Sequence, residues 1–109
     1  MNINEFWKTL RQSQLSMAEV SVLSFIEKND DCRHPDIEKG VFPHLSPSSS
    51  RQRAAGVIKK LRDLELISTN YSFVSQPLHY YERNKNFPHQ SINRHGKALL
   101  RAFDKALDT

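Results

Sequence analysis

Apolar side chains recur at helical spacing along most of the chain, and residues 46–64 carry the clearest such pattern. Ser46 suits the N-cap of a helix, and Pro47 falls at the first helical position, where its missing amide hydrogen costs nothing. The pattern predicts a helix that buries one side. Its apolar face consists of residues three or four positions apart, namely Ala54, Val57, Ile58, Leu61 and Leu64.

The other side of this predicted helix is short, polar and positive. Residues 47–62 contain no acidic residue and five basic ones, which are Arg51, Arg53, Lys59, Lys60 and Arg62. Such a face is typical of a helix that enters the major groove of DNA, and a solvated basic surface is the alternative. At 100° per residue the outer face comprises Ser48, Ser49, Gln52, Arg53, Gly56 and Lys59.

Two amphipathic helices are predicted near the N-terminus. The first covers residues 2–12, with Asn2 as its cap. The second covers residues 16–29 and opens with a capping box, S-x-x-E, formed by Ser16 and Glu19. The wide apolar face of this second helix indicates a central position in the core.

A short third helix is predicted over residues 35–39, beginning at Pro35 and ending at Gly40. The preceding residues 29–34, NDDCRH, are predicted to form a polar loop. A short helix followed by the basic helix gives a helix-turn-helix arrangement.

After residue 64 the pattern changes to residue types that favour strands. Residues 66 and 67 begin an extended segment, and Pro77 interrupts the aromatic residues that follow. Residues 78–92 are predicted to form a β-hairpin whose tip carries Arg83 and Lys85. Asn93 then caps a last helix that runs from Arg94 to about residue 107.

The predicted fold class is therefore mainly α with a small β-hairpin, a winged helix-turn-helix. The 109 residues form one predicted domain. An N-terminal helix occupies residues 1–13, the helix-turn-helix and wing occupy residues 16–92, and a C-terminal helix occupies residues 93–109.

Charge is segregated along the chain. Residues 1–45 hold five basic and seven acidic residues, whereas residues 46–109 hold eleven basic and five acidic ones. The net charge of +4 is therefore concentrated after residue 45, which indicates a side that faces a polyanion.

Several classes of function have no support in the sequence. One cysteine, Cys32, permits neither an intrachain disulfide nor a multi-cysteine zinc site, and the five histidines lack ligand spacing. No catalytic motif is present, so we expect no enzyme activity, no metal and no cofactor. No apolar run is long enough for a membrane span or a signal peptide, which favours a cytoplasmic protein. Cys32 next to Arg33 is either a redox-sensitive thiol or an incidental loop residue.

The sequence of the second half of the chain resembles that of MarR-like winged-helix regulators. The basic helix opens with Leu45-Ser46-Pro47-Ser48, and residues 61–67 read LRDLELI, close to the phrase that ends the recognition helix in that family. Residues 92–99, INRHGKAL, match the family phrase after the wing. The resemblance implies a transcriptional regulator that binds double-stranded DNA. Glu65 stands where the family has glycine. The chain is also shorter than typical members, whose long terminal helices build the dimer and a ligand pocket, so a small-molecule effector is not expected.

The predicted DNA-binding residues divide by role. Gln52 and Arg53 are the candidate base readers, because they match adenine and guanine edges in the major groove. Phosphate contacts are predicted for Ser48, Ser49, Arg51, Lys59 and Lys60, and backbone approach at Gly56. The wing residues Arg83 and Lys85 are predicted to reach the minor groove or its phosphates. Capping by the serines and a solvated turn at the tip are the alternatives.

We also expect a homodimer held by the terminal helices, since one winged helix reads only a short site. The alternative is that the two helices pack on each other within one monomer. A protein-interaction adaptor, or an accessory DNA-binding protein of phage or plasmid replication or excision, remains a rival function. The predicted dimerisation residues are Ile3, Phe6, Trp7, Leu10, Leu99, Leu100, Phe103 and Leu107.

Overall fold

The structure is a computed structural model, and it describes residues 3–73 and 86–108. Its helices are α1 (Ile3–Ser13), α2 (Met17–Lys28), α3 (His34–Val41), α4 (Pro47–Asp63) and α5 (Arg94–Asp108). The strands β1 (Cys32–Arg33), β2 (Ile67–Phe73) and β3 (Asn86–Ile92) form an antiparallel sheet in the order β1-β3-β2. This arrangement confirms the predicted class, a mainly helical winged helix-turn-helix.

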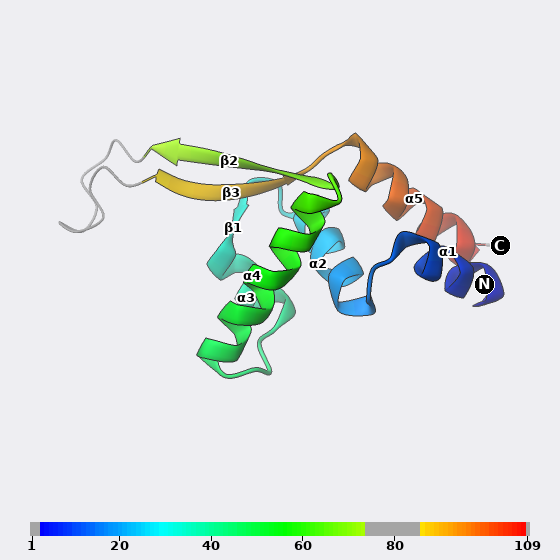
Figure 1. Ribbon diagram of the computed structural model, residues 1–109, viewed down its shortest axis with the longest axis horizontal. Coiled ribbons are helices and arrows are strands. Elements are labelled where there is room, and N and C mark those ends of the chain that lie inside the picture. The colour runs from blue at the N-terminus through cyan, green and yellow to red at the C-terminus, as the bar shows by residue number, and fades with distance from the viewer. Residues whose placement is uncertain (1–2, 74–85, 109) are drawn as a thin grey trace.

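Figure 1 shows three parts in a row. Helices α2, α3 and α4 form the body together with the base of the sheet, and the β2–β3 ribbon extends from one side of it. On the other side α1 and α5 lie side by side and carry both chain ends; we call this pair the arm. None of the helices in residues 3–73 and 86–108 has the length and apolar character needed to cross a membrane.

The core of the body is built from the predicted apolar faces. Leu23 and Ile26 of α2, Ile37 of α3 and Leu61 of α4 are completely buried. Ala54, Val57 and Ile58 of α4 are buried as well, which confirms the predicted inner face of that helix. Leu64 is the exception, because it is the C-cap and is 38% exposed.

Local capping signals fix where the helices begin. The Ser16 hydroxyl accepts a hydrogen bond from the Glu19 amide, and a Glu19 carboxylate oxygen accepts one from the Ser16 amide at 2.7 Å. The predicted capping box is therefore confirmed. Ser46 caps α4 and Asn93 caps α5, each through a side-chain oxygen that accepts a first-turn amide hydrogen.

Helix α3 is longer than predicted, and Gly40 lies inside it rather than at its end. The Phe25 ring of α2 occupies the space where a Cβ at residue 40 would lie. Gly40 is therefore present because the two helices approach closely, which spacing along the chain does not reveal. The buried Ser50 of α4 adds a second tie, since its hydroxyl donates to the Glu38 carbonyl of α3.

The predictions for the sheet need two corrections. The partner of β3 is β2, with Ile67 opposite Ile92, whereas the prediction paired it with a segment that begins at residue 78. That predicted first arm of the hairpin lies outside the described residues. The predicted loop at residues 29–34 contains β1, whose Cys32 lies opposite Gln90 of β3. A two-residue strand has no pattern of its own and forms only because a partner strand is present.

Helix α4 ends in a left-handed residue that is not glycine. Glu65 has a φ of 59°, and the hydrogen bond from the Leu66 amide to the Leu61 carbonyl completes a Schellman motif. The Asn93 side chain donates to the Glu65 carbonyl, which joins the end of α4 to the start of α5. Glu65 therefore adopts a backbone conformation that favours glycine, and hydrogen bonds on both sides of it hold this end of the helix in place.

Candidate nucleic-acid interface

The outer face of α4 is open to solvent along its length. The predicted contact residues on it are all exposed, namely Ser48, Ser49, Arg51, Gln52, Arg53, Gly56 and Lys59. A Cβ built at Gly56 would meet no described atom within 4 Å, so the glycine backbone lies bare at the centre of this face. The combination of a buried inner face and a bare outer face leaves α4 free to approach a partner directly.

The N-terminal turn of α4 carries the two serines. The amide of Ser49 is held by the Ser46 cap at 3.3 Å, whereas the side chains of Ser48 and Ser49 are exposed. Their hydroxyls lie at the positive end of the helix dipole, which favours an approaching anion. The next residue, Ser50, points the other way and is buried.

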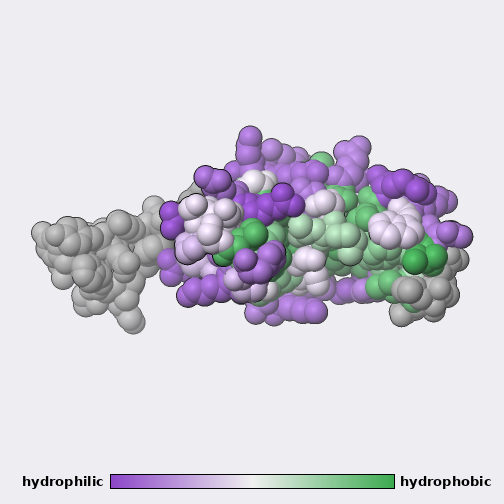
Figure 2. All heavy atoms as spheres, turned by 90° about the horizontal axis from the view of Figure 1, so that it is seen from below, coloured by the Kyte–Doolittle hydropathy of each residue, from purple (hydrophilic) through white to green (hydrophobic). Residues whose placement is uncertain are grey.

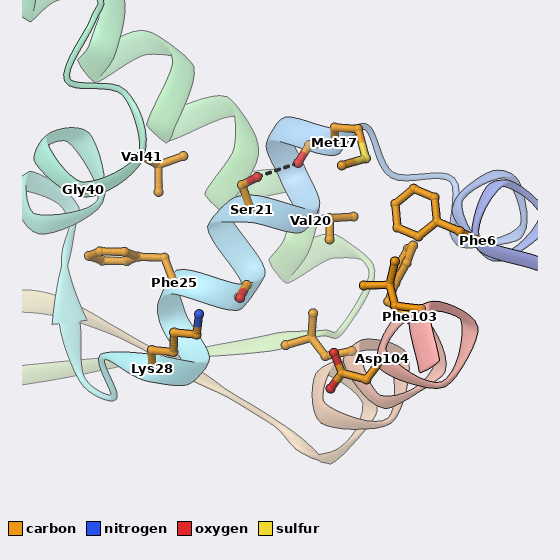
Figure 3. A pocket seen from close by; sticks show the side chains of 13 residues that line it. Phe6, Met17, Val20, Ser21, Phe25, Lys28, Gly40, Val41, Phe103 and Asp104 are labelled. Atoms are coloured by element: carbon orange, nitrogen blue, oxygen red, sulfur yellow. Dashed lines mark hydrogen bonds between the residues drawn. The ribbon is translucent and has the colours of Figure 1, made fainter. Parts of the chain in front are cut away.

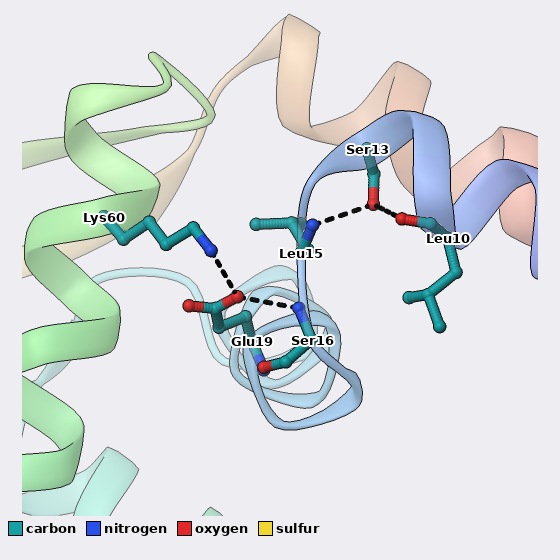
Figure 4. A network of polar contacts seen from close by, with 6 residues as sticks. All are labelled: Leu10, Ser13, Leu15, Ser16, Glu19 and Lys60. Atoms are coloured by element: carbon teal, nitrogen blue, oxygen red, sulfur yellow. Dashed lines mark hydrogen bonds and ion pairs between the residues drawn. The ribbon is translucent and has the colours of Figure 1, made fainter.

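Lys60 differs from the other predicted phosphate contacts. Its ammonium group lies 2.9 Å from a carboxylate oxygen of Glu19, in an ion pair that joins α4 to α2 (Figure 4). Burial alone would raise the pKa of the Glu19 carboxyl, but the Ser16 amide and Lys60 outweigh it and hold the pKa below its ordinary value. The capping box identifies Glu19, but its partner 41 positions along the chain leaves no signal in the sequence.

An open groove of about 660 Å³ runs beside α4, between that helix and the start of α2. Gln52, Arg53 and Gly56 lie along one wall, and Ser16 and Glu19 along the other. The candidate base readers therefore stand at the rim of a polar groove rather than on a flat surface. The predicted wing contacts, Arg83 and Lys85, lie outside the described residues.

The predicted dimerisation residues fall into two groups. Phe6 of α1 packs on Phe103 of α5, with ring centroids 5.7 Å apart, so the terminal helices do contact each other within one chain. Leu100 and Phe103 are buried by this packing and by the body, while Leu10 and Leu99 are partly buried. Ile3, Trp7 and Leu107 stay 53%, 46% and 40% exposed.

The exposed apolar residues continue onto α2. Met17 is 48% exposed, and Figure 2 shows hydrophobic residues gathered in a band along one face, with hydrophilic residues on both sides. A groove of about 590 Å³ opens here between the arm and the body. In Figure 3, Phe6 and Phe103 point toward Val20 at one end of this groove, and Phe25 lies with Val41 at the other.

Several titratable residues outside α4 form local pairs in the part of the chain that the structure describes. Within residues 3–73 and 86–108 no group of three or more histidine, cysteine, aspartate or glutamate side chains could hold a metal ion. His34 pairs with Glu38, and His89 bonds to the Asp31 carbonyl. Burial raises the pKa of Cys32 to about 11, so the thiol is neutral at pH 7 and lacks the activation that a redox-sensitive thiol needs.

No protein-family model matches the chain, and no curated protein matches it. Solved structures do match. A MepR mutant from S. aureus, bound to an oligodeoxyribonucleotide, has a TM-score of 0.70 at 14% identity and covers 93% of this chain. BpsR from Bordetella bronchiseptica, whose DNA binding is regulated by 6-hydroxynicotinic acid, has a TM-score of 0.66 at 19% identity and covers 98%.

The fold shared with both structures confirms the predicted MarR-like winged-helix architecture. This chain spans only 64% of the MepR chain and 66% of the BpsR chain. The expectation that no small-molecule effector acts gains no support, because BpsR is regulated by such a molecule.

Proposed function

We propose that the protein is a transcriptional regulator of the cytoplasm that binds double-stranded DNA with α4 in the major groove. One observation carries the proposal: α4 buries Ala54, Val57, Ile58 and Leu61, and its exposed opposite side carries no acidic residue before Asp63, the last residue of the helix. A helix that serves only the core has no need of a continuous cationic and small-residue face. The DNA-bound MepR structure, which shares this fold, supports the proposal.

The exposed residues divide into readers and anchors. Gln52 and Arg53 present amide and guanidinium groups to base edges, and Gly56 lets the backbone come close to the groove floor. Ser48, Ser49, Arg51 and Lys59 meet phosphates on either side. Arg83 and Lys85 complete the proposal as contacts from the wing.

Fluorescence anisotropy with labelled duplexes over a series of salt concentrations tests the proposal. Affinity should fall as salt rises, with a logarithmic slope of about −0.9 for every phosphate neutralised. Selection from a random duplex library should then yield a preferred sequence. Absence of binding at low salt, or an affinity that does not change with salt, would refute the proposal.

Two variants separate the roles. Arg53→Ala should relax the preference at one or two base pairs, at a cost of about 1–3 kcal/mol for a bidentate contact. Lys59→Ala is the matched control, since it lies on the same exposed face and should weaken all duplexes alike while reducing the salt slope. Equal, uniform losses in both variants would contradict the assignment of Arg53 as a reader.

We further propose that a second copy of the chain covers the exposed part of the arm. Ile3, Trp7 and Leu107 remain open although Phe6 and Phe103 already pack together, so the contact within one chain leaves apolar surface to be buried. Two winged helices related by a two-fold axis would read two half-sites. Sedimentation at micromolar concentration should give a dimer, and Trp7→Ala should shift it toward the monomer.

The same exposed residues favour one rival function, a protein-interaction adaptor. A sharp monomer mass that Trp7→Ala leaves unchanged would refute the dimer. A monomer that binds no duplex but captures a protein partner, and keeps it after charge reversal at Arg51 and Arg53, would favour the adaptor.

A further inference from the structure

The contact between Glu19 and Lys60 is placed where DNA would approach. Lys60 lies one turn after Gly56 on α4, and both residues line the groove between α4 and the start of α2. The Lys60 side chain is 42% exposed and is therefore accessible from solvent. The Glu19 side chain is only 13% exposed.

We propose that Glu19 is a positioning residue that withholds Lys60 from the DNA phosphates and so limits the affinity that does not depend on sequence. The inference rests on the proposed function of DNA binding. In native protein the carboxylate, not a phosphate, neutralises the Lys60 ammonium group.

Glu19 is well suited to this role because its carboxylate is fixed in place. The oxygen that contacts Lys60 also accepts the Ser16 amide hydrogen at 2.7 Å, within the capping box that begins α2 (Figure 4). The contacts that lower its pKa keep the carboxylate ionised near neutral pH. A phosphate that competes for Lys60 must therefore displace a rigid anion rather than a mobile side chain.

The surroundings indicate that the carboxylate opposes an anion. Glu19 is the acidic member of the described set of residues that line this groove, beside the cations Arg53 and Lys60. Because Glu19 neutralises Lys60, the groove carries less positive charge than Arg53 and Lys60 alone would give it. Non-specific binding depends on the number of phosphates neutralised, so one withheld lysine lowers it for every duplex alike.

Glu19→Gln is the decisive variant, since glutamine keeps the capping hydrogen bond but carries no charge. Freed Lys60 should add one phosphate contact, which steepens the salt slope by about 0.9 and raises affinity for all duplexes about fivefold to tenfold at 0.1 M salt. The ratio of affinities for a preferred and a random duplex should stay unchanged, because the added contact reads no base.

Lys60→Met provides the matched test in the native background. It removes the ammonium group and keeps the apolar stem, so the salt slope should stay at the native value, and the double variant should lose the gain seen with Glu19→Gln. Lys59→Ala, by contrast, should reduce the slope by about 0.9 in both backgrounds. If Glu19→Gln does not fold, Lys60→Met decides alone: a slope reduced by about 0.9 means that Lys60 already contacts phosphate and overturns the inference.

A purely structural tie between α2 and α4 predicts a different result. Glu19→Gln would then lower the melting temperature and leave the salt slope and affinity unchanged, which overturns the inference while the native protein still binds DNA. If neither native protein nor Glu19→Gln binds duplex at low salt, the proposed function fails and the inference fails with it.

Discussion

The body and the arm carry the same kind of amphipathic helix but treat its apolar face differently. In the body, Val22, Leu23, Ile26, Ile37 and Leu61 are completely buried. In the arm, the structure describes all of α1, and none of its residues is buried. Leu107 of α5 is 40% exposed. A helix in the body has neighbours on several sides, whereas α1 has essentially one, α5. The body therefore encloses its own core, whereas the arm leaves apolar side chains exposed.

The largest expected contrast lies between two leucines. Leu61→Ala in the body should lower the free energy of unfolding by about 2–5 kcal/mol, because it leaves a cavity in a closed core. Leu107→Ala in the arm should cost less than about 1 kcal/mol at a concentration where the protein is monomeric. Urea denaturation measures both values. A large loss for Leu107→Ala that disappears on dilution would show that a second chain covers the arm.

Two glycines should sharpen the difference between the inside and the outside of the body. Gly40→Ala should destabilise by about 1–3 kcal/mol, because its Cβ would overlap the Phe25 ring. Gly56→Ala should stabilise by up to about 1 kcal/mol, since it has open space and alanine favours helix. Thermal melting gives both signs, and DNA binding should nevertheless weaken in Gly56→Ala. If both variants changed the melting temperature in the same direction, either the packing of Gly40 against Phe25 or the exposure of Gly56 would be wrong.

A gain in stability of similar size to that of Gly56→Ala is expected where the body meets the arm. Glu65→Gly should raise the free energy of unfolding by about 1 kcal/mol, because glycine adopts a φ of 59° without strain. The hydrogen bond from Asn93 to the carbonyl of residue 65 does not depend on the side chain there and should survive. Denaturation of Glu65→Gly beside Glu65→Ala, which keeps the strain, separates this effect from loss of the glutamate charge.

The last effect concerns the thiol of Cys32 in the body, and it is absent near neutral pH and appears only at high pH. The folded protein holds the pKa of Cys32 at about 11, above its ordinary value of 9.0. A raised pKa stabilises the fold below pH 9 and loses that contribution as pH rises toward 11, because the unfolded thiol ionises first. Cys32→Ala should remove this part of the decline. At pH 8 a thiol reagent should attack Cys32 slowly and a cysteine placed by Leu107→Cys quickly, and equal rates would refute the burial of Cys32.

The sequence by itself determined the helices of the body and the two faces of α4. The capping box of Ser16 and Glu19, the cap at Ser46 and the cap at Asn93 are each formed by groups within four residues of one another. Apolar spacing likewise sorts Val57 to the inside and Gln52 to the outside without reference to any other element. These short-range patterns can be recognised in the sequence because helix geometry places residues that are three or four positions apart next to one another.

Only the tertiary structure decided which distant groups meet. Strand β1 exists because Cys32 pairs with Gln90, 58 positions away, and β2 rather than a later segment supplies the partner of β3. Lys60 carries the same charge as Lys59 in the sequence, yet it is held by Glu19 while Lys59 is exposed. These outcomes depend on contacts between elements that lie far apart in the sequence and meet only when the chain folds. The spacing of neighbouring residues therefore does not encode them.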